Sequence, residues 1–177
     1  MDIQQVFVIG AGTMGNGIAQ TAATSGFRVT CMDVAPAALE KARAAIARSV
    51  QKLAEKGALT GEQKAAAGAI EFVGSLERAE TADLIVEAAT ENPEIKYRLF
   101  QDIDAAARPD AILASNTSSI SITKIASHTR RPDRVIGMHF MNPVPLMKLV
   151  EVIRGLATSP ETAQRALEVC KKMDKIA

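Results

Sequence analysis

A histidine and a glutamate stand in two apolar runs in the last third of the sequence. His139 ends the run Val135–His139, and Glu151 interrupts the run KLVEVI. A carboxylate hydrogen-bonded to an imidazole fixes the tautomer of the ring and stabilises its protonated form, as a general base for an alcohol proton requires. His139 could equally be a hydrogen-bonded imidazole of the core, and the sequence does not show that the two side chains touch. Both interpretations stay open at this point.

Polar residues cluster in the stretch Ser115–Ser119, directly after a short apolar run. This stretch contains Asn116 and Ser118, and His139 ends a later apolar run. If both runs are parallel strands, their carboxyl ends meet at one edge of the sheet, where doubly wound proteins bind their ligands. The polar groups are therefore expected to converge with His139 on one crevice.

A glycine-rich stretch, VFVIGAGTMGNGIA, joins an apolar run to a segment with helical spacing. Its glycines form the pattern GxGxxG, which is typical of dinucleotide-binding turns when a strand precedes it and a helix follows. The first glycine permits a sharp turn, the second lets the backbone approach a pyrophosphate, and the third lets helix and strand pack closely. The N–H groups at the helix N-terminus then face the phosphates. The residues expected to bind cofactor here are Gly10, Ala11, Gly12, Thr13, Met14 and Gly15.

An aspartate follows the glycine pattern at the distance that dinucleotide-binding proteins use. Asp33 lies 18 residues beyond Gly15, at the end of the next apolar run. Its carboxylate can accept both ribose hydroxyls and would repel a 2′-phosphate, and no arginine follows in DVAPAAL, so the sequence predicts NAD rather than NADP. A tight turn without a ligand and an S-adenosylmethionine site are the alternatives. The third glycine and the aspartate together favour the dinucleotide.

Short apolar runs alternate with longer stretches of helical period along the chain. The expected strands are Gln5–Ile9, Arg28–Met32, Leu84–Glu87, Ala111–Ala114, Val135–His139 and Met147–Ile153. The clearest expected helices are Thr13–Ser25, Pro36–Glu55, Pro93–Ala107 and Pro160–Met173. This alternation predicts an α/β protein with a doubly wound, mostly parallel Rossmann sheet.

One part of the chain does not fit a simple strand-helix-strand repeat. Pro36–Glu55 is too long for an ordinary crossover, and a second helical segment starts at Thr60, with Gln63 at capping-box spacing, and runs to about Ala69. We expect an inserted helical hairpin, about residues 36–70, that stands off the sheet. An apolar stripe on its first helix consists of Leu39, Ala42, Ile46, Val50 and Leu53.

A polar face of the same helix carries Ser49, Lys52 and Lys56, with Arg48 beside them. These positions fall within about 60° of one another at the helical period. Taken alone, such a face is more typical of a solvated surface than of a ligand site.

The composition excludes several classes of protein. A net charge of +1 and 3% aromatic residues give neither the basic field nor the stacking platforms of a nucleic-acid or membrane binder. The two cysteines, Cys31 and Cys170, lack metal-ligand spacing, so we expect no metal site and two reduced thiols in a cytoplasmic protein. No signal peptide or apolar run of membrane-spanning length is recognised.

Three stretches of the sequence resemble the 3-hydroxyacyl-CoA dehydrogenase family, and in particular its bacterial 3-hydroxybutyryl-CoA members. They are VIGAGTMGNGIA, ASNTSSISIT and RPDRVIGMHFMNPVPLMKLVEVI, and the likeness extends over essentially all 177 residues. Many enzymes share GxGxxG, whereas SNTSS followed by GMHFxNP and LVEV at these spacings is specific. The resemblance implies NAD-dependent oxidation of a short L-3-hydroxyacyl-CoA, or the reverse reduction.

The resemblance also implies roles for individual residues. The implied catalytic residues are His139 as base, Glu151 as its orienting partner, Ser118 as a hydrogen-bond donor near the substrate oxygen and nicotinamide, and Asn116 beside them. Further cofactor contacts are implied at Glu91, Lys96, Ser118 and Asn142. Coenzyme A is expected at Ser49, Lys52 and Lys56, because an ammonium opposite a phosphate is a favourable pairing.

Members of this family normally continue into a mostly helical C-terminal domain that completes the pocket and forms a homodimer. We expect residues 1–177 to be the NAD-binding domain alone, with that domain absent from the chain. Two other functions stay open: a hydroxy-acid or L-gulonate 3-dehydrogenase, and a nucleotide-binding module without turnover.

Overall fold

Seven strands form the central sheet of this protein, whose computed structural model describes residues 2–177. The strand order is β3-β2-β1-β4-β5-β6-β7, and every neighbouring pair is parallel except β6 and β7. The strands are β1 (Gln5–Ile9), β2 (Arg28–Met32), β3 (Glu71–Val73), β4 (Leu84–Glu87), β5 (Ile112–Ser115), β6 (Val135–Phe140) and β7 (Val150–Arg154). The predicted doubly wound, mostly parallel Rossmann sheet is confirmed.

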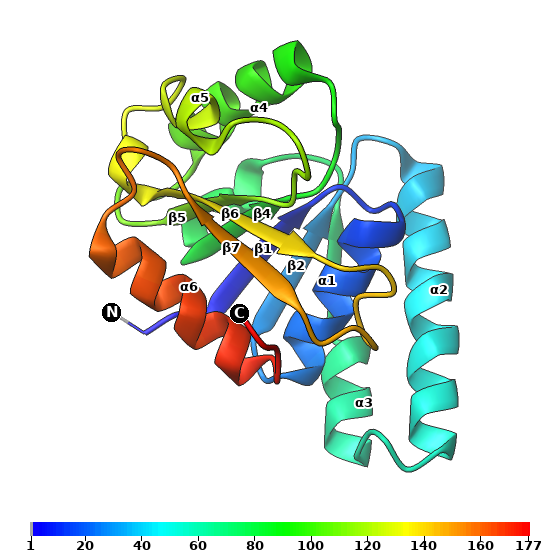
Figure 1. Cartoon of the computed structure of the whole chain (residues 1–177). Helices are drawn as coiled ribbons and strands as arrows, with labels where there is room; N and C mark the ends of the chain where they lie inside the picture. The colour runs from blue at the N-terminus through cyan, green and yellow to red at the C-terminus, as the bar shows by residue number, and fades with distance from the viewer. Residues whose placement is uncertain (1) are drawn as a thin grey trace.

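Helices cover both faces of this sheet (Figure 1). The α-helices are α1 (Thr13–Thr24), α2 (Pro36–Glu55), α3 (Gly61–Gly68), α4 (Pro93–Ala106), α5 (Ile122–Ala126) and α6 (Pro160–Lys172), and the 3-10 helices are η1 (Glu77–Thr81) and η2 (Pro132–Arg134). α1 and α6 lie on one face, and α4 and α5 lie on the other. Among residues 2–177, no helix is long and apolar enough to cross a membrane.

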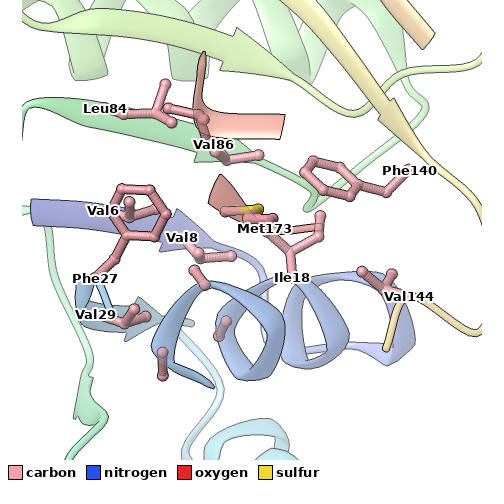
Figure 2. Close-up of a cluster of buried hydrophobic side chains, with 14 of the residues drawn as sticks. Val6, Val8, Ile18, Phe27, Val29, Leu84, Val86, Phe140, Val144 and Met173 are labelled. Atoms are coloured by element: carbon pink, nitrogen blue, oxygen red, sulfur yellow. The ribbon is translucent and has the colours of Figure 1, made fainter. Parts of the chain in front are cut away.

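The alternation of side chains along each strand divides the core into two clusters. Val6 and Val8 of β1 pack with α1 and α6, whereas Phe7 and Ile9 pack with α4 and α5. In Figure 2 the labelled side chains of the first cluster come from β1, β2, β4, β6, α1 and neighbouring segments, and Met173, just after α6, lies among them. Both faces of β1 are therefore buried, as expected for a central parallel strand.

The helical hairpin is formed by α2 and α3 and packs on α1, which in turn contacts β1 and β2. Three residues of the predicted apolar stripe, Ala42, Ile46 and Val50, are buried in this contact. The capping box is present, because Gln63 N donates to Thr60 Oγ1 at 3.1 Å and Thr60 N donates to Gln63 Oε1 at 2.9 Å. The hairpin is thus attached to α1, on the side of that helix away from the sheet (Figure 1).

Several sequence-based boundaries differ from the structure by one residue, one differs by three, and four short elements were not predicted. The last strand begins at Val150 rather than Met147, because the prolines of residues 143–145 start a turn in which Pro143 O accepts from Leu146 N and Met147 N. The fifth strand is Ile112–Ser115, one residue later than predicted. The unpredicted elements are β3, α5, η1 and η2, whose three to five residues are too short to show a clear period.

Close contact between β1 and α1 depends on two glycines. Gly10 has a φ of +101°, and a side chain there would also lie 2.6 Å from Ala88 O. A Cβ at Gly15 would lie 1.6 Å from Gly10 O, so no side chain fits between helix and turn. The predicted packing role of the third glycine therefore has a direct geometric basis.

Gly15→Ala should destabilise the fold, since α1 would have to move away from β1. We expect the free energy of unfolding in urea to fall by about 2–3 kcal/mol or more. Gly68→Ala is the matched control: it is another helical glycine, but nothing lies within 4 Å of the place that a Cβ would take there, and the change should stabilise the protein by about 0.5–1 kcal/mol. Equal unfolding midpoints for the two variants would contradict the proposed contact.

Candidate active site

His139 and Glu151 face each other across the antiparallel pair β6 and β7. The two residues are directly opposite in the strand register, and His139 Nδ1 lies 2.8 Å from Glu151 Oε1. The side chain of His139 is 22% exposed and that of Glu151 is 53% exposed. Glu151 lies on an edge strand of the sheet, where its side chain reaches solvent.

This hydrogen bond leaves one ring nitrogen of His139 for chemistry. With Nδ1 bonded to a carboxylate, Nε2 is the nitrogen that can accept a proton from a ligand hydroxyl. The carboxylate would then stabilise the positive charge that develops on the ring. The pair has the arrangement of a general base with its orienting partner.

Asn116 links the ends of two neighbouring strands. Its side-chain Oδ1 accepts from Phe140 N at 2.8 Å, and its backbone N donates to Glu87 O at 2.8 Å. Phe140 directly follows His139, so this bond fixes the end of β6 where the imidazole lies. Ser118 is exposed two residues beyond Asn116. The structure thus brings Asn116, Ser118 and His139 to the carboxyl ends of β5 and β6.

The glycine turn forms an open cradle at the N-terminus of α1. Gly12 is the N-cap, no side chain caps the helix, and nothing lies within 4 Å of the place where a Cβ would be. Its φ of −70° is accessible to any residue, so the backbone conformation does not require a glycine at this position. The glycine instead keeps open the space that a side chain would fill. A pocket of about 390 Å³, here called the glycine-loop pocket, is lined by Ala11, Gly12, Thr13, Asn16, Ala38, Lys41, Ala44, Ala45 and Arg48. These features fit the pyrophosphate of a dinucleotide.

Asp33 is held beside this turn at the end of β2. Its Oδ2 accepts from Ala11 N and its Oδ1 from Ala35 N, each at 2.9 Å. Burial and the nearby Asp33 carboxylate raise the pKa of the Cys31 thiol to about 12, so the thiol under the turn stays neutral. The carboxylate is half-buried and has lone pairs left for a ribose.

The two residues expected from TENPEIK to contact the cofactor have very different surroundings. Glu91 is exposed and accepts from Thr117 Oγ1 at 2.8 Å. Lys96 is buried, and its ammonium donates to Glu87 Oε1 at 2.6 Å. A cofactor contact of either residue stays a prediction, and for Lys96 the charge is already paired within the protein.

A second pocket, here called the hairpin pocket, lies between α1, α2 and the loop after β6. Its volume is about 380 Å³, and its lining includes Ser49, Lys52, Lys56, Asn142 and Arg48. The structure therefore brings the polar face of α2 together with the residue expected to bind cofactor in that loop. This arrangement favours a ligand site over the solvated surface that the helix face alone suggested.

Sequence reasoning missed three residues that shape this pocket. Gln20 is buried and its Nε2 donates to Ser49 Oγ at 2.9 Å. A Cβ at Gly17 would lie 2.9 Å from Val144 Cβ, so this glycine lets the loop pack on α1. Lys175 donates to Val144 O and Met147 O, and burial lowers the pKa of its ammonium. The extra glycine of GNGIA was the one signal in the sequence that could have indicated this contact.

A larger pocket, of about 490 Å³, lies at the opposite edge of the sheet. It is lined by the amino ends of β1 and β2, including Gln5 and Arg28. None of the predicted site residues lines it. The predicted catalytic residues and the glycine turn lie instead near the carboxyl ends of the parallel strands.

The fold and these sites define a dinucleotide-binding Rossmann domain with a hydrogen-bonded histidine and glutamate at the edge of the sheet where its parallel strands end. Residues 5–177 match the family described as 3-hydroxyacyl-CoA dehydrogenase, NAD binding domain. The chain belongs to this family, as the resemblance predicted, and the prediction of NAD as cofactor is confirmed.

Relatives and a solved structure support the same family. The chain is 52% identical over 178 residues to the probable 3-hydroxybutyryl-CoA dehydrogenase of Bacillus subtilis, covering 100% of this chain and 62% of that protein. It is 41% identical over 170 residues to the 3-hydroxyadipyl-CoA dehydrogenase of Escherichia coli, covering 96% and 36%. The crystal structure of (S)-3-hydroxybutyryl-CoA dehydrogenase from Ralstonia eutropha superposes with a TM-score of 0.94 at 46% identity, covering 98% and 62%. The chain thus spans less than two thirds of the length of these proteins.

Asp33→Asn should change cofactor preference, since it removes the charge that repels a 2′-phosphate while keeping an oxygen for Ala11 N. We expect weaker NADH binding and a higher ratio of NADPH to NADH affinity, measured by fluorescence titration of both cofactors. Asp102→Asn, on the exposed side of α4, is the control and should leave the ratio unchanged. An unchanged ratio in Asp33→Asn would place Asp33 outside the ribose site.

Proposed function

We propose that the chain serves NAD-dependent oxidation of an L-3-hydroxyacyl-CoA to the 3-ketoacyl-CoA, and the reverse reduction. The observation that carries this proposal is the 2.8 Å hydrogen bond between His139 and Glu151 at the carboxyl edge of an NAD-binding sheet. The name of the Bacillus subtilis relative supports a short acyl group such as 3-hydroxybutyryl. The name of the Escherichia coli relative shows that a family member this similar is assigned to a different acyl chain.

His139 is the proposed base. Its Nε2 takes the proton of the substrate hydroxyl while Glu151 stabilises the imidazolium from Nδ1. Ser118, exposed at the end of β5, donates a hydrogen bond to the same substrate oxygen. Bound NAD supplies the hydride acceptor. In the reverse direction His139 returns the proton to the ketone oxygen.

Coenzyme A is proposed to bind in the hairpin pocket. Ser49, Lys52 and Lys56 line this pocket with Asn142, so its basic wall faces the loop that follows His139 by three residues. Ammonium groups pair well with the phosphates of a coenzyme. The same basic wall favours an acyl-CoA over a free hydroxy acid such as L-gulonate, which has no phosphates to occupy it.

The proposal also includes the oligomeric state, the cellular location and the domain that residues 1–177 form. The resemblance supports a homodimer that assembles through a C-terminal domain in the full-length protein, with residues 1–177 as the NAD-binding unit. A cytoplasmic location is supported by the two cysteines, both of them free thiols. Analytical ultracentrifugation of the full-length protein tests the dimer.

The function is tested by separate titrations of NADH and acetoacetyl-CoA, followed by loss of NADH absorbance when both are present. We expect binding of both ligands to this chain, and turnover in a chain extended through the C-terminal domain of its relatives. Binding of NADH alone, with no turnover in either form, would leave the nucleotide-binding module as the function. Turnover of a free hydroxy acid without acetoacetyl-CoA binding would favour the second dehydrogenase alternative.

His139→Gln should lower turnover of the extended chain roughly a hundredfold or more, because the amide cannot accept the proton as hydride leaves. NADH affinity should be retained, since the change lies away from the glycine loop. Glu151→Gln should also lower turnover, and the double variant should be little slower than His139→Gln, because the two residues act as one unit. If the turnover losses of the two single variants multiplied in the double variant, the two residues would not act as a unit. Near-normal turnover in His139→Gln would indicate that His139 is a structural residue and not the base.

Lys56→Glu should weaken acetoacetyl-CoA binding several-fold, since it reverses a charge on the wall of the hairpin pocket. NADH affinity should stay nearly constant, and isothermal titration measures both. Lys64→Glu makes the same charge change on α3, outside the pocket, and serves as the control. An equal loss of affinity for both ligands would indicate a folding defect. Unchanged affinity for acetoacetyl-CoA would indicate that this face of α2 is a solvated surface.

A further inference from the structure

A buried ion pair lies under the candidate site, at the carboxyl ends of β4 and β5. Glu87, Lys96 and Ser115 are 0%, 1% and 0% exposed. Lys96 Nζ lies 2.6 Å from Glu87 Oε1 and 3.2 Å from Ser115 Oγ, and Ser115 Oγ donates to Glu87 Oε1 at 2.8 Å. Neither Glu87 nor Ser115 has a part in the proposed reaction.

The second oxygen of Glu87 holds the loop that follows β4. Glu87 Oε2 accepts from Ala89 N at 2.9 Å and from Thr90 N at 3.3 Å. Both carboxylate oxygens are therefore occupied, and the path of the backbone toward Glu91 is set. This loop also touches the glycine turn, because a Cβ at Gly10 would lie 2.6 Å from Ala88 O.

Ser115 and Thr117 extend the same hydrogen-bond chain into the loop that follows β5. Ser115 Oγ accepts from Thr117 N at 3.2 Å. The Thr117 hydroxyl accepts from Ile120 N at 3.0 Å and donates to Glu91 Oε2 at 2.8 Å. Thr117 is only 2% exposed. The two loops are thus joined to each other, and Ser118 lies between residues that this chain of bonds fixes.

These two loops lie where the nicotinamide half of a bound cofactor would have to be. Asp33 directly follows β2 and His139 lies near the end of β6, and β1, β4 and β5 stand between these two strands in the sheet. A dinucleotide with its adenosine ribose at Asp33 and its reacting ring near His139 therefore crosses the loops after β4 and β5 with its nicotinamide half. Its adenosine half stays over β1 and β2.

A buried ion pair is a poor means of stabilising a fold, since desolvation offsets most of the attraction and apolar residues often serve as well. We propose that Glu87, Ser115 and Thr117, together with the ammonium of Lys96, are positioning residues that hold the two loops in the shape required by the nicotinamide half of the cofactor. The proposal rests on the proposed function only for the direction in which the cofactor lies. It assigns Lys96 a part in this support, whether or not its ammonium also meets a ligand.

The test compares NADH with ADP-ribose, which lacks the nicotinamide. Thr117→Val removes the hydroxyl and keeps the shape of the side chain. We expect the Kd for NADH to rise roughly fivefold or more, the scale of one or two lost hydrogen bonds, while the Kd for ADP-ribose stays within about twofold. Thr117→Ser keeps the hydroxyl and should restore NADH binding.

Thr158→Val is the matched control for a general loss of stability. Thr158 is also buried, at 4% exposed, and its hydroxyl donates to Val135 O at 2.7 Å and accepts from Gly155 N at 2.8 Å. It lies at the amino end of β6, the edge of the sheet away from the site. Its ratio of NADH to ADP-ribose affinity should equal that of the wild type. An equal change of the ratio in both valine variants, or NADH binding in Thr117→Val within twofold of the wild type, would overturn the proposal.

Ser115→Ala provides the same comparison if circular dichroism shows that Thr117→Val does not fold. It removes one donor to Glu87 and one acceptor for Thr117 N, and the same selective loss of NADH affinity is expected. Failure of the proposed function is a separate result: a wild-type chain that binds NADH but never turns over acetoacetyl-CoA leaves the affinity ratio measurable. Loss of NADH and ADP-ribose affinity in equal proportion in Ser115→Ala would also overturn the positioning role.

Discussion

The close approach of α1 to the turn after β1, where a Cβ at Gly15 would lie 1.6 Å from Gly10 O, sets the position of α1 and of the segments that pack on it. Because α1 lies directly against β1, its N-terminus comes to the end of the strand, where Gly12 leaves room for a phosphate. The helical hairpin then packs on the outer side of α1, and the loop after β6 packs on Gly17. One helix therefore forms the wall of both pockets, and a displacement of α1 would alter them together.

Two carboxylates near the carboxyl ends of the parallel strands, Glu87 and Glu151, each have a basic partner and differ in burial. This difference distinguishes a pair that supports the loops from a pair that could transfer a proton. Glu87 and Lys96 are enclosed, and both carboxylate oxygens of Glu87 are occupied by partners within the protein, so this carboxylate supports the loops rather than a ligand. His139 and Glu151 remain partly exposed, and one ring nitrogen is unoccupied by the pair. A proton-transfer group needs that access, whereas a scaffold needs the fixed geometry that complete hydrogen bonding provides.

Local patterns were sufficient for much of the fold, whereas the partners within the site were not predictable from them. GxGxxG with Asp33, and the apolar stripe that includes Ile46, report on backbone shape and burial, which depend on neighbours in the chain. The 2.8 Å contact of His139 with Glu151 depends on β7 running antiparallel to β6, and the sequence does not reveal that direction. Glu87 and Gln20 resemble ordinary residues of a strand end and a helix, because the serines that they contact, Ser115 and Ser49, are 28 and 29 residues away along the chain. The sequence shows that such a residue is polar, but the order and direction of the strands determine which residue it contacts.

The glycine-loop pocket and the hairpin pocket share a wall, which bears on how their ligands can be separated experimentally. Thr13, Asn16 and Arg48 line both pockets, whereas Lys41 lines only the first and Lys56 only the second. Two phosphate-bearing ligands bound side by side would repel each other across that wall, and a cation between them would attract both. A change at Arg48 therefore alters the electrostatics of both sites at once and reports on neither alone. Residues that line a single pocket are the ones whose substitution can assign a ligand to its site.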